Sequence, residues 1–285
     1  MYLWPMQKHL LVLAALALFA PACVGTTSTL QTAPTLGKGN VQVAAGMSIP
    51  VSTRFVREVA DAVTEVNERV KNSDSSPLSR DEQREVMQTT LGVLLFQPAL
   101  LTIFDLRYGV AEKVDLGLKM AGAATRLEGK YWLQHQEGGL DVALNLGLTR
   151  HSEIGSSVAK KGFDFLDSVD LAAFKRRDID GAILLSSDAK KKWGFYGAIR
   201  YLAAFVKAET SFSKVLTQED ITEIDVDETM HHYGGTAGVR ATLGPVQLMV
   251  ELTIMRLAFS PTILDEEVQL GGYIIEPAAG LSVSF

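Results

Sequence analysis

The sequence predicts an all-β fold: an antiparallel, up-and-down β-barrel of about ten strands, with a helical insertion in its first long loop. Three observations predict it. Apolar and polar residues alternate along ten segments, the links between those segments alternate between short and long, and the polar positions hold many glycines. Because successive side chains of a strand point to opposite faces, each alternating segment forms a ribbon with one apolar and one polar face.

Composition narrows the functional classes. The chain has 285 residues with 27 Lys and Arg, 33 Asp and Glu, and a net charge of -6. This mildly acidic balance, without a basic run, argues against nucleic-acid binding. Beyond the N-terminal region no apolar run reaches the roughly 18 residues that a membrane-spanning helix needs. The single cysteine excludes an intramolecular disulfide.

Residues 1–22 have the pattern of a secretory signal peptide. Lys8 precedes an apolar stretch over Leu10–Phe19, and Ala20-Pro21-Ala22 supplies small residues at a cleavage boundary. Two interpretations of Cys23 stay open: lipidation, which would anchor the mature N-terminus, or simple cleavage before an unmodified cysteine. Residues 23–38 are then expected to form a linker, and 39–285 the barrel domain.

The ten expected strands share the alternation of apolar and polar residues. They are Val41–Ile49, Leu100–Val110, Leu116–Met120, Leu127–Leu133, Leu140–Leu148, Ile179–Ser186, Trp193–Phe205, Tyr233–Leu243, Val246–Ile254 and Tyr273–Val283.

The links between these strands differ in length in a regular way. Those after the second, fourth, sixth and eighth strands are short, whereas long loops are expected near Arg54–Phe96, His151–Arg177 and Glu209–Glu228. Membrane barrels combine short turns at one end with longer loops at the other. An even number of strands should place both chain ends at the short-turn end.

The first long loop carries a helical signal over about residues 54–97. Val59, Val63, Val66 and Val70 recur at helical spacing, and Ser79-Arg80-Asp81-Glu82 matches a capping box that would start a second helix running towards Phe96. We therefore expect a helical hairpin, which either packs at the barrel rim or plugs the lumen. A further short helix is predicted over Phe163–Phe174.

The last strand carries a family resemblance. Over Val268–Phe285, apolar residues alternate with small or polar ones and the series ends on an aromatic side chain. This ending resembles bacterial outer-membrane β-barrel proteins. The resemblance implies export to the bacterial outer membrane, with membrane lipid and the barrel-assembly machinery as partners. It also implies that Phe285 is part of the signal that this machinery recognises.

Two architectures fit alternating ribbons: a membrane barrel with its apolar face towards lipid, or a soluble barrel with that face inward. Charges of both signs mixed with glycines on the polar faces favour a crowded polar lumen, and aromatic residues near the ribbon ends favour lipid contact. The residues expected to line the lumen are Asp105, Arg107, Lys119, Arg126, Glu128, Lys130, Arg200, Arg240 and Glu251.

These lumen charges allow two roles, a salt-bridged plug that closes the barrel or the lining of a small polar pore. The predicted function is therefore structural or the passage of small polar solutes. A soluble lipoprotein that binds an apolar ligand inside its barrel is the alternative.

A second alternative is an outer-membrane protease of the omptin type, which uses acidic residues and a histidine at the external rim. Asp225, Asp227 and Glu228 near His231 and His232 match it in residue type alone. Neighbouring residues of a strand face opposite ways, so His231 and His232 cannot share one metal ion. No enzyme activity, cofactor or metal site is expected.

Overall fold

The computed structural model describes residues 26–54, 79–96, 98–134, 139–152, 169–188, 191–212 and 224–285. The predicted signal peptide, Cys23 and the first predicted helix of the insertion lie outside these residues. Among the described residues, no helix is both long and apolar enough to cross a membrane.

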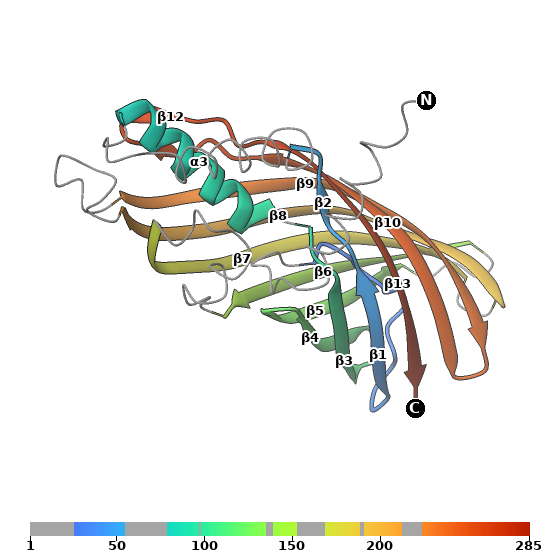
Figure 1. The fold of residues 1–285 in the computed structure, drawn as a ribbon. Helices are drawn as coiled ribbons and strands as arrows, with labels where there is room; N and C mark the ends of the chain where they lie inside the picture. The colour runs from blue at the N-terminus through green and yellow to red at the C-terminus, as the bar shows by residue number, and fades with distance from the viewer. Residues whose placement is uncertain are drawn as a thin grey trace, which may run out of the picture.

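Ten antiparallel strands close into a barrel, as the sequence predicts (Figure 1). Each strand pairs with its neighbours in chain order, and β1 and β13 pair with each other to complete the circle. The strands are β1 (Val41–Ser48), β3 (Leu101–Ala111), β4 (Val114–Ala121), β5 (Ala124–Gln134), β6 (Leu140–His151), β7 (Val169–Ser187), β8 (Trp193–Phe212), β9 (Ile224–Leu243), β10 (Val246–Ala258) and β13 (Gly272–Ser284).

Three short strands lie outside the ten. The two-residue β2 (Val51–Ser52) pairs with β13 beyond the end of β1. β11 (Thr262–Ile263) and β12 (Glu266–Glu267) form a small hairpin between β10 and β13.

The two ends of the barrel differ in their connections. We call the end that carries the links β3–β4, β5–β6, β7–β8 and β9–β10 the short-turn end, and the opposite end the long-loop end. The β9–β10 link is only two residues long. Its Gly244 adopts a φ of +63°, which is unfavourable for a residue with a side chain. The opposite end carries the three predicted long links, β1–β3, β6–β7 and β8–β9, but its β4–β5 link is also only two residues long, so the asymmetry holds for most of the links and not for all.

The wall of the barrel is much taller on one side. β7, β8 and β9 have 19, 20 and 20 residues, whereas β4 has 8. Two sequence predictions were wrong here. Val169–Phe174 belongs to β7 rather than to a helix, and β8 and β9 extend into the loop predicted over Glu209–Glu228. In these strands the backbone pairing continues past the apolar band. Apolar alternation therefore marks only part of each strand.

The predicted second helix of the insertion is present as α3 (Arg80–Phe96). Its capping box forms: the Ser79 backbone N–H donates to Glu82 at 2.8 Å, and the Glu82 N–H donates to the Ser79 hydroxyl at 3.4 Å. Arg80 pairs with Asp265 and Arg84 with Glu266, at 2.6 and 2.5 Å. These contacts hold α3 beside the β11–β12 hairpin, at the end where β8 and β9 project (Figure 1).

The faces of the barrel are arranged as in lipid rather than in water. Outward side chains along the strands are exposed and apolar, such as Leu127, Leu146, Leu148 and Ile199, whose exposed fractions are 57–65%. Inward side chains are buried and largely polar or charged. The alternative of a soluble barrel enclosing an apolar ligand is therefore wrong, because the apolar surface is on the outside.

Candidate functional site

The lumen is the candidate functional site, because it collects most of the buried charge among the residues that the structure describes. All nine side chains predicted to line it are buried, each with an exposed fraction of 6% or less. They are Asp105, Arg107, Lys119, Arg126, Glu128, Lys130, Arg200, Arg240 and Glu251. Their strands place them at alternate positions, so one side chain in two points inward.

Five of these residues, together with the buried Asp180, which the sequence did not single out, form a continuous belt of charges across four strands. Glu128 on β5 accepts hydrogen bonds from Arg107 on β3 and from Arg126 at 2.8 Å. Asp180 on β7 bridges Arg126 to Arg200 on β8, the latter at 3.0 Å. Asp105 completes the belt at 3.0 Å from Arg107. Three positive and three negative groups alternate, so the belt presents no single-sign ring that would select cations or anions.

A glycine makes room for the centre of this belt. Gly147 on β6 is the register partner of Glu128, and a Cβ built there would lie 2.5 Å from the guanidinium carbon of Arg126. Any side chain would therefore displace Arg126. This explains why glycine accompanies the inward charges.

A segment that the sequence suggests to be a linker lies inside the barrel. Residues 26–36 run through the lumen from the long-loop end to the short-turn end, and we call them the lumen segment. Near the long-loop end, the Thr26 hydroxyl lies 3.3 Å from that of Ser48, the last residue of β1. Near the short-turn end, the Leu36 N–H donates to Asp115, at the start of β4, at 3.0 Å.

The lumen segment therefore places Thr26 at the opposite end of the barrel from the one that the strand number predicts. With an even strand number, both chain ends were expected at the short-turn end. β1 does begin there, but Thr26 is at the opposite end, because the chain crosses the lumen before entering β1. Glu276, which accepts from the Thr26 hydroxyl at 2.5 Å, fixes this position.

Two wall carboxylates hold the backbone of the lumen segment. Glu251 accepts from the Thr29 and Leu30 N–H groups at 2.7 and 2.8 Å, and from the Ser28 hydroxyl at 2.7 Å. Glu276 accepts from the Thr27 N–H at 2.7 Å and also from its hydroxyl. Buried carboxylates that lack a cation are costly unless hydrogen-bonded, and the lumen segment supplies those donors.

Wall cations bind the carbonyl groups of the same segment. Lys119 donates to Thr29 O at 2.8 Å, Lys130 to Pro34 O at 2.7 Å, and Arg200 to Thr27 O at 2.5 Å. Arg200 thus connects the charge belt to the lumen segment. An irregular backbone inside a membrane barrel needs such partners, since its polar groups have no bulk water to bond.

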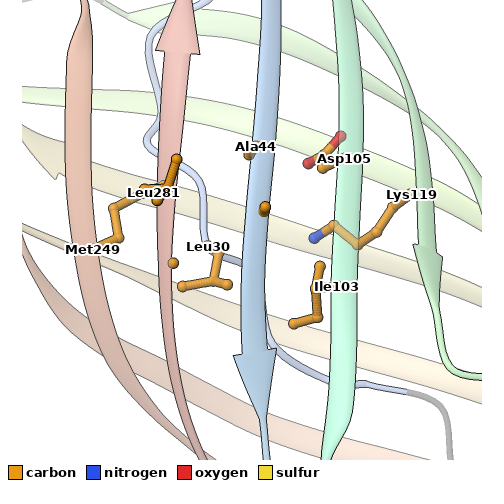
Figure 2. Close-up of a pocket in the computed structure, with 9 residues that line it drawn as sticks. Leu30, Ala44, Ile103, Asp105, Lys119, Met249 and Leu281 are labelled. Atoms are coloured by element: carbon orange, nitrogen blue, oxygen red, sulfur yellow. The ribbon is translucent and has the colours of Figure 1, made fainter.

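Leu30 anchors the middle of the lumen segment by packing. Figure 2 shows its side chain between Met249 on one side and Ile103 on the other. Gly46 on β1 and Gly280 on β13 make room for it: a Cβ added to Gly46 would lie 2.8 Å from a Leu30 methyl, and one added to Gly280 would lie 3.0 Å from it. The cavity left here is about 10 Å³.

A second cavity lies towards the long-loop end. It measures about 20 Å³ and is bordered by Thr26, Thr149, Arg176 and Asp178. A water needs at least about 10–15 Å³ measured in this way. Each of the two cavities therefore has room for about one water and none for an organic ligand.

The acidic and histidine residues considered for proteolysis do not assemble. His231 faces outward and its Nδ1 lies 2.8 Å from the Tyr201 hydroxyl, whereas His232 is buried on the inward face. Asp227 pairs with Lys207 at 2.6 Å. Among the described residues, no hydrogen bond joins Asp227 or Glu228 to either histidine.

Within the part of the chain that the structure describes, a carboxylate–histidine pair forms that the sequence did not predict. His151 Nε2 lies 3.1 Å from Asp178, and Arg176 donates to the same carboxylate at 2.8 and 3.0 Å. Asp178 lies just before the predicted strand Ile179–Ser186, so no alternation drew attention to it. With the carboxylate held by Arg176 and one water-sized cavity beside it, the arrangement is that of a buried ion pair.

The remaining predicted residues are placed as follows. Phe285 is 75% exposed, and its N–H donates to the Val41 carbonyl at 2.9 Å, extending the β1–β13 closure. Cys23 and Asp225's side chain are not among the described groups. Within the described ranges, no cluster of three His, Cys, Asp or Glu side chains could hold a metal ion.

A closed antiparallel barrel that is apolar outside and charged inside is the arrangement of transmembrane β-barrels. No protein-family model matches the sequence, and comparison with curated protein sequences gives no match.

Solved structures resemble the chain at low identity. Outer membrane protease OmpT from Escherichia coli is 11% identical, with a TM-score of 0.42 over 91% of this chain and 100% of that one. Neisserial surface protein A is 11% identical, with a TM-score of 0.35 over 86% and 96%. Ail, the attachment invasion locus protein of Yersinia pestis, is 8% identical, with a TM-score of 0.30 over 87% and 99%. The fold assignment comes from the chain's own strand pairing.

Proposed function

We propose that this chain is a bacterial outer-membrane β-barrel with a closed lumen and a structural role, whose contacts with other molecules are made by its outer face and long loops. The observation that carries the proposal is the lumen segment. Residues 26–36 occupy the space that a solute would cross, held by Glu251, Glu276, Lys119, Lys130 and Arg200.

Three features support the membrane location within this proposal. The outward side chains are apolar, the backbone of the barrel is closed, and exposed aromatic residues lie towards both ends, including Tyr108 and Trp193 at the short-turn end and Tyr233 at the other. Open strand edges are not tolerated in lipid, and aromatic girdles lie at headgroup level. Membrane lipid and the machinery that inserts barrels are then the expected partners.

Export belongs to the same proposal. Residues 1–22 would be removed as a signal peptide, and Cys23 would become the first residue, with or without a lipid. Mass spectrometry of the protein from the membrane fraction tests both points. An intact Met1 would contradict export by cleavage, and the mass of the N-terminal peptide distinguishes lipidated from free Cys23.

The closed lumen is tested by conductance in planar bilayers. Refolded protein, verified by heat-modifiable migration on a gel, should produce no steady ion current. The paired variant Glu251→Ala/Glu276→Ala, which removes both carboxylates that hold the lumen segment, should produce measurable openings. Steady current through the unaltered protein would contradict the closed barrel and favour the pore interpretation.

A further inference from the structure

We propose that the outer face of the barrel at the long-loop end binds the phosphate groups of lipids, through Arg150 on β6 and Arg177 on β7. This site is distinct from the lumen; it deepens the outer-membrane location proposed above and rests on it. The two arginines are register partners on neighbouring strands, and both side chains are exposed on the outward face.

Their lack of partners sets these arginines apart from the other cations nearby. Among the described residues, neither Arg150 nor Arg177 forms an ion pair or a hydrogen bond through its side chain. Lys207, two strands from Arg150, is paired with Asp227 at 2.6 Å, and every arginine of the lumen belt contacts a carboxylate.

Two like charges at opposed positions repel each other. Side chains directly opposite on antiparallel strands have Cβ atoms about 5 Å apart, and like charges there are destabilising. An anion bound between the two guanidinium groups would be attracted by both of them and would relieve this repulsion. Phosphate fits this position, because two of its oxygens accept two parallel hydrogen bonds from one planar guanidinium group. The geometry is therefore suited to an anion that two arginines share.

The position of the pair relative to the apolar surface identifies the kind of ligand. One outward position nearer the short-turn end, Leu148 and Ile179 are also register partners, with exposed fractions of 61% and 52%. The arginines thus stand where the apolar band ends. A membrane lipid covers both the leucine–isoleucine surface and the arginines, because its acyl chains lie directly beside its anionic group.

The same end of the barrel has further features of a headgroup layer. On β9 and β10, Arg256 lies over the ring of Tyr233 at 5.9 Å, and both are exposed on the outward face. Tyr273 follows as the register partner of Arg256. Tyrosines and arginines with polar tips above an apolar band are typical of the membrane interface.

The proposal is tested with three proteins in two lipid environments. The unaltered chain, the paired variant Arg150→Gln/Arg177→Gln, and a matched control, Lys191→Gln/Lys192→Gln, are placed in nanodiscs. The discs contain phosphatidylcholine alone, whose phosphate is neutralised by its own choline cation, or phosphatidylcholine with lipid A, a glycolipid whose phosphate groups carry uncompensated negative charge. The control removes two exposed charges at the short-turn end. Native mass spectrometry counts retained lipid A, and the melting temperature is recorded in each disc.

The unaltered protein and the control should retain lipid A and melt higher in its presence. The arginine variant should retain lipid A about tenfold less well, since each basic residue at a membrane surface contributes measurably to binding anionic lipid. It should match the others in phosphatidylcholine, which shows that the barrel itself is intact.

Two results would overturn the proposal. The first is equal retention of lipid A by the arginine variant and the unaltered protein. The second is equal stabilisation of the unaltered protein by inorganic phosphate in phosphatidylcholine discs, which would indicate a site for free anions.

Discussion

Glu251 on β10 accepts the backbone N–H of Leu30 at 2.8 Å, joining two residues that are 221 positions apart in the chain. Neither neighbour of Glu251 in the sheet offers a positive charge, because its register partners are Gly238 and Ala278. The carboxylate is therefore satisfied by the lumen segment instead of by the wall. The lumen segment therefore supplies hydrogen bonds that the wall of the barrel needs.

Replacing Glu251 with alanine should loosen the lumen segment. Four hydrogen bonds end on this carboxylate, and bonds to charged groups contribute about 1.5–3 kcal/mol each, although their losses do not add fully. We expect a loss of about 2–4 kcal/mol, measured as a lower temperature of unfolding on heat-modifiability gels. Glu267→Ala, at an exposed carboxylate of β12, is the control and should unfold as the unaltered protein does.

The charge belt should be sensitive at Glu128, where it bridges Arg107 and Arg126. Glu128→Gln leaves two buried guanidinium groups short of a carboxylate, and breaking a buried pair costs about 3–5 kcal/mol. Asp227→Asn breaks the exposed pair with Lys207 and should cost about 1 kcal/mol or less. Urea unfolding in detergent compares the two variants, and equal losses would contradict a stabilising belt.

Glycine should be required next to the belt but not on the outer face. A Cβ on Gly147 would lie 2.5 Å from Arg126, whereas one on Gly129 would lie 3.9 Å from Leu116. Gly147→Ala should therefore lower the yield of folded barrel and its unfolding temperature, while Gly129→Ala should leave both nearly unchanged. Refolding yields measured side by side decide this, and a tolerant Gly147 would show that Arg126 has another accessible position.

The direction of the lumen segment can be tested by a disulfide. In a Cys23→Ser background, Thr26→Cys/Ser48→Cys should cross-link, because the two hydroxyl oxygens lie 3.3 Å apart. Thr26→Cys/Gln42→Cys should not, since Gln42 lies six residues along β1, about 20 Å away at about 3.3 Å per residue. Non-reducing peptide mass spectrometry reports the link. A cross-link to position 42 instead would place Thr26 at the short-turn end.

The apolar outer face should reject charge in a depth-dependent way. Leu146→Arg introduces a cation within the outward apolar band of β6 and should cost about 2–4 kcal/mol. Leu243→Arg, at the β9–β10 turn, should cost about 0–1 kcal/mol near the interface. Both leucines are about equally exposed, at 57% and 51%. Unfolding in lipid vesicles measures the difference, and equal tolerance would contradict a lipid-facing band.

The sequence by itself determined the class of fold and the direction in which each side chain points. Alternation with a period of two depends only on local strand geometry, so the outward position of Leu146 and the inward positions of Arg107 and Glu128 could be predicted without knowing any partner. The capping box at Ser79 is equally local, and α3 begins where it predicts.

The tertiary structure decided everything that depends on distant residues. The partners of Glu128 follow from register across β3 and β5, and the true start of β7 at Val169 follows from pairing with β8, where apolar alternation no longer marks the strand. Residues 26–36 have no apolar period of their own. Their place in the lumen is set by Glu251, Glu276 and Lys119, which lie on three different strands and surround this segment in the closed barrel.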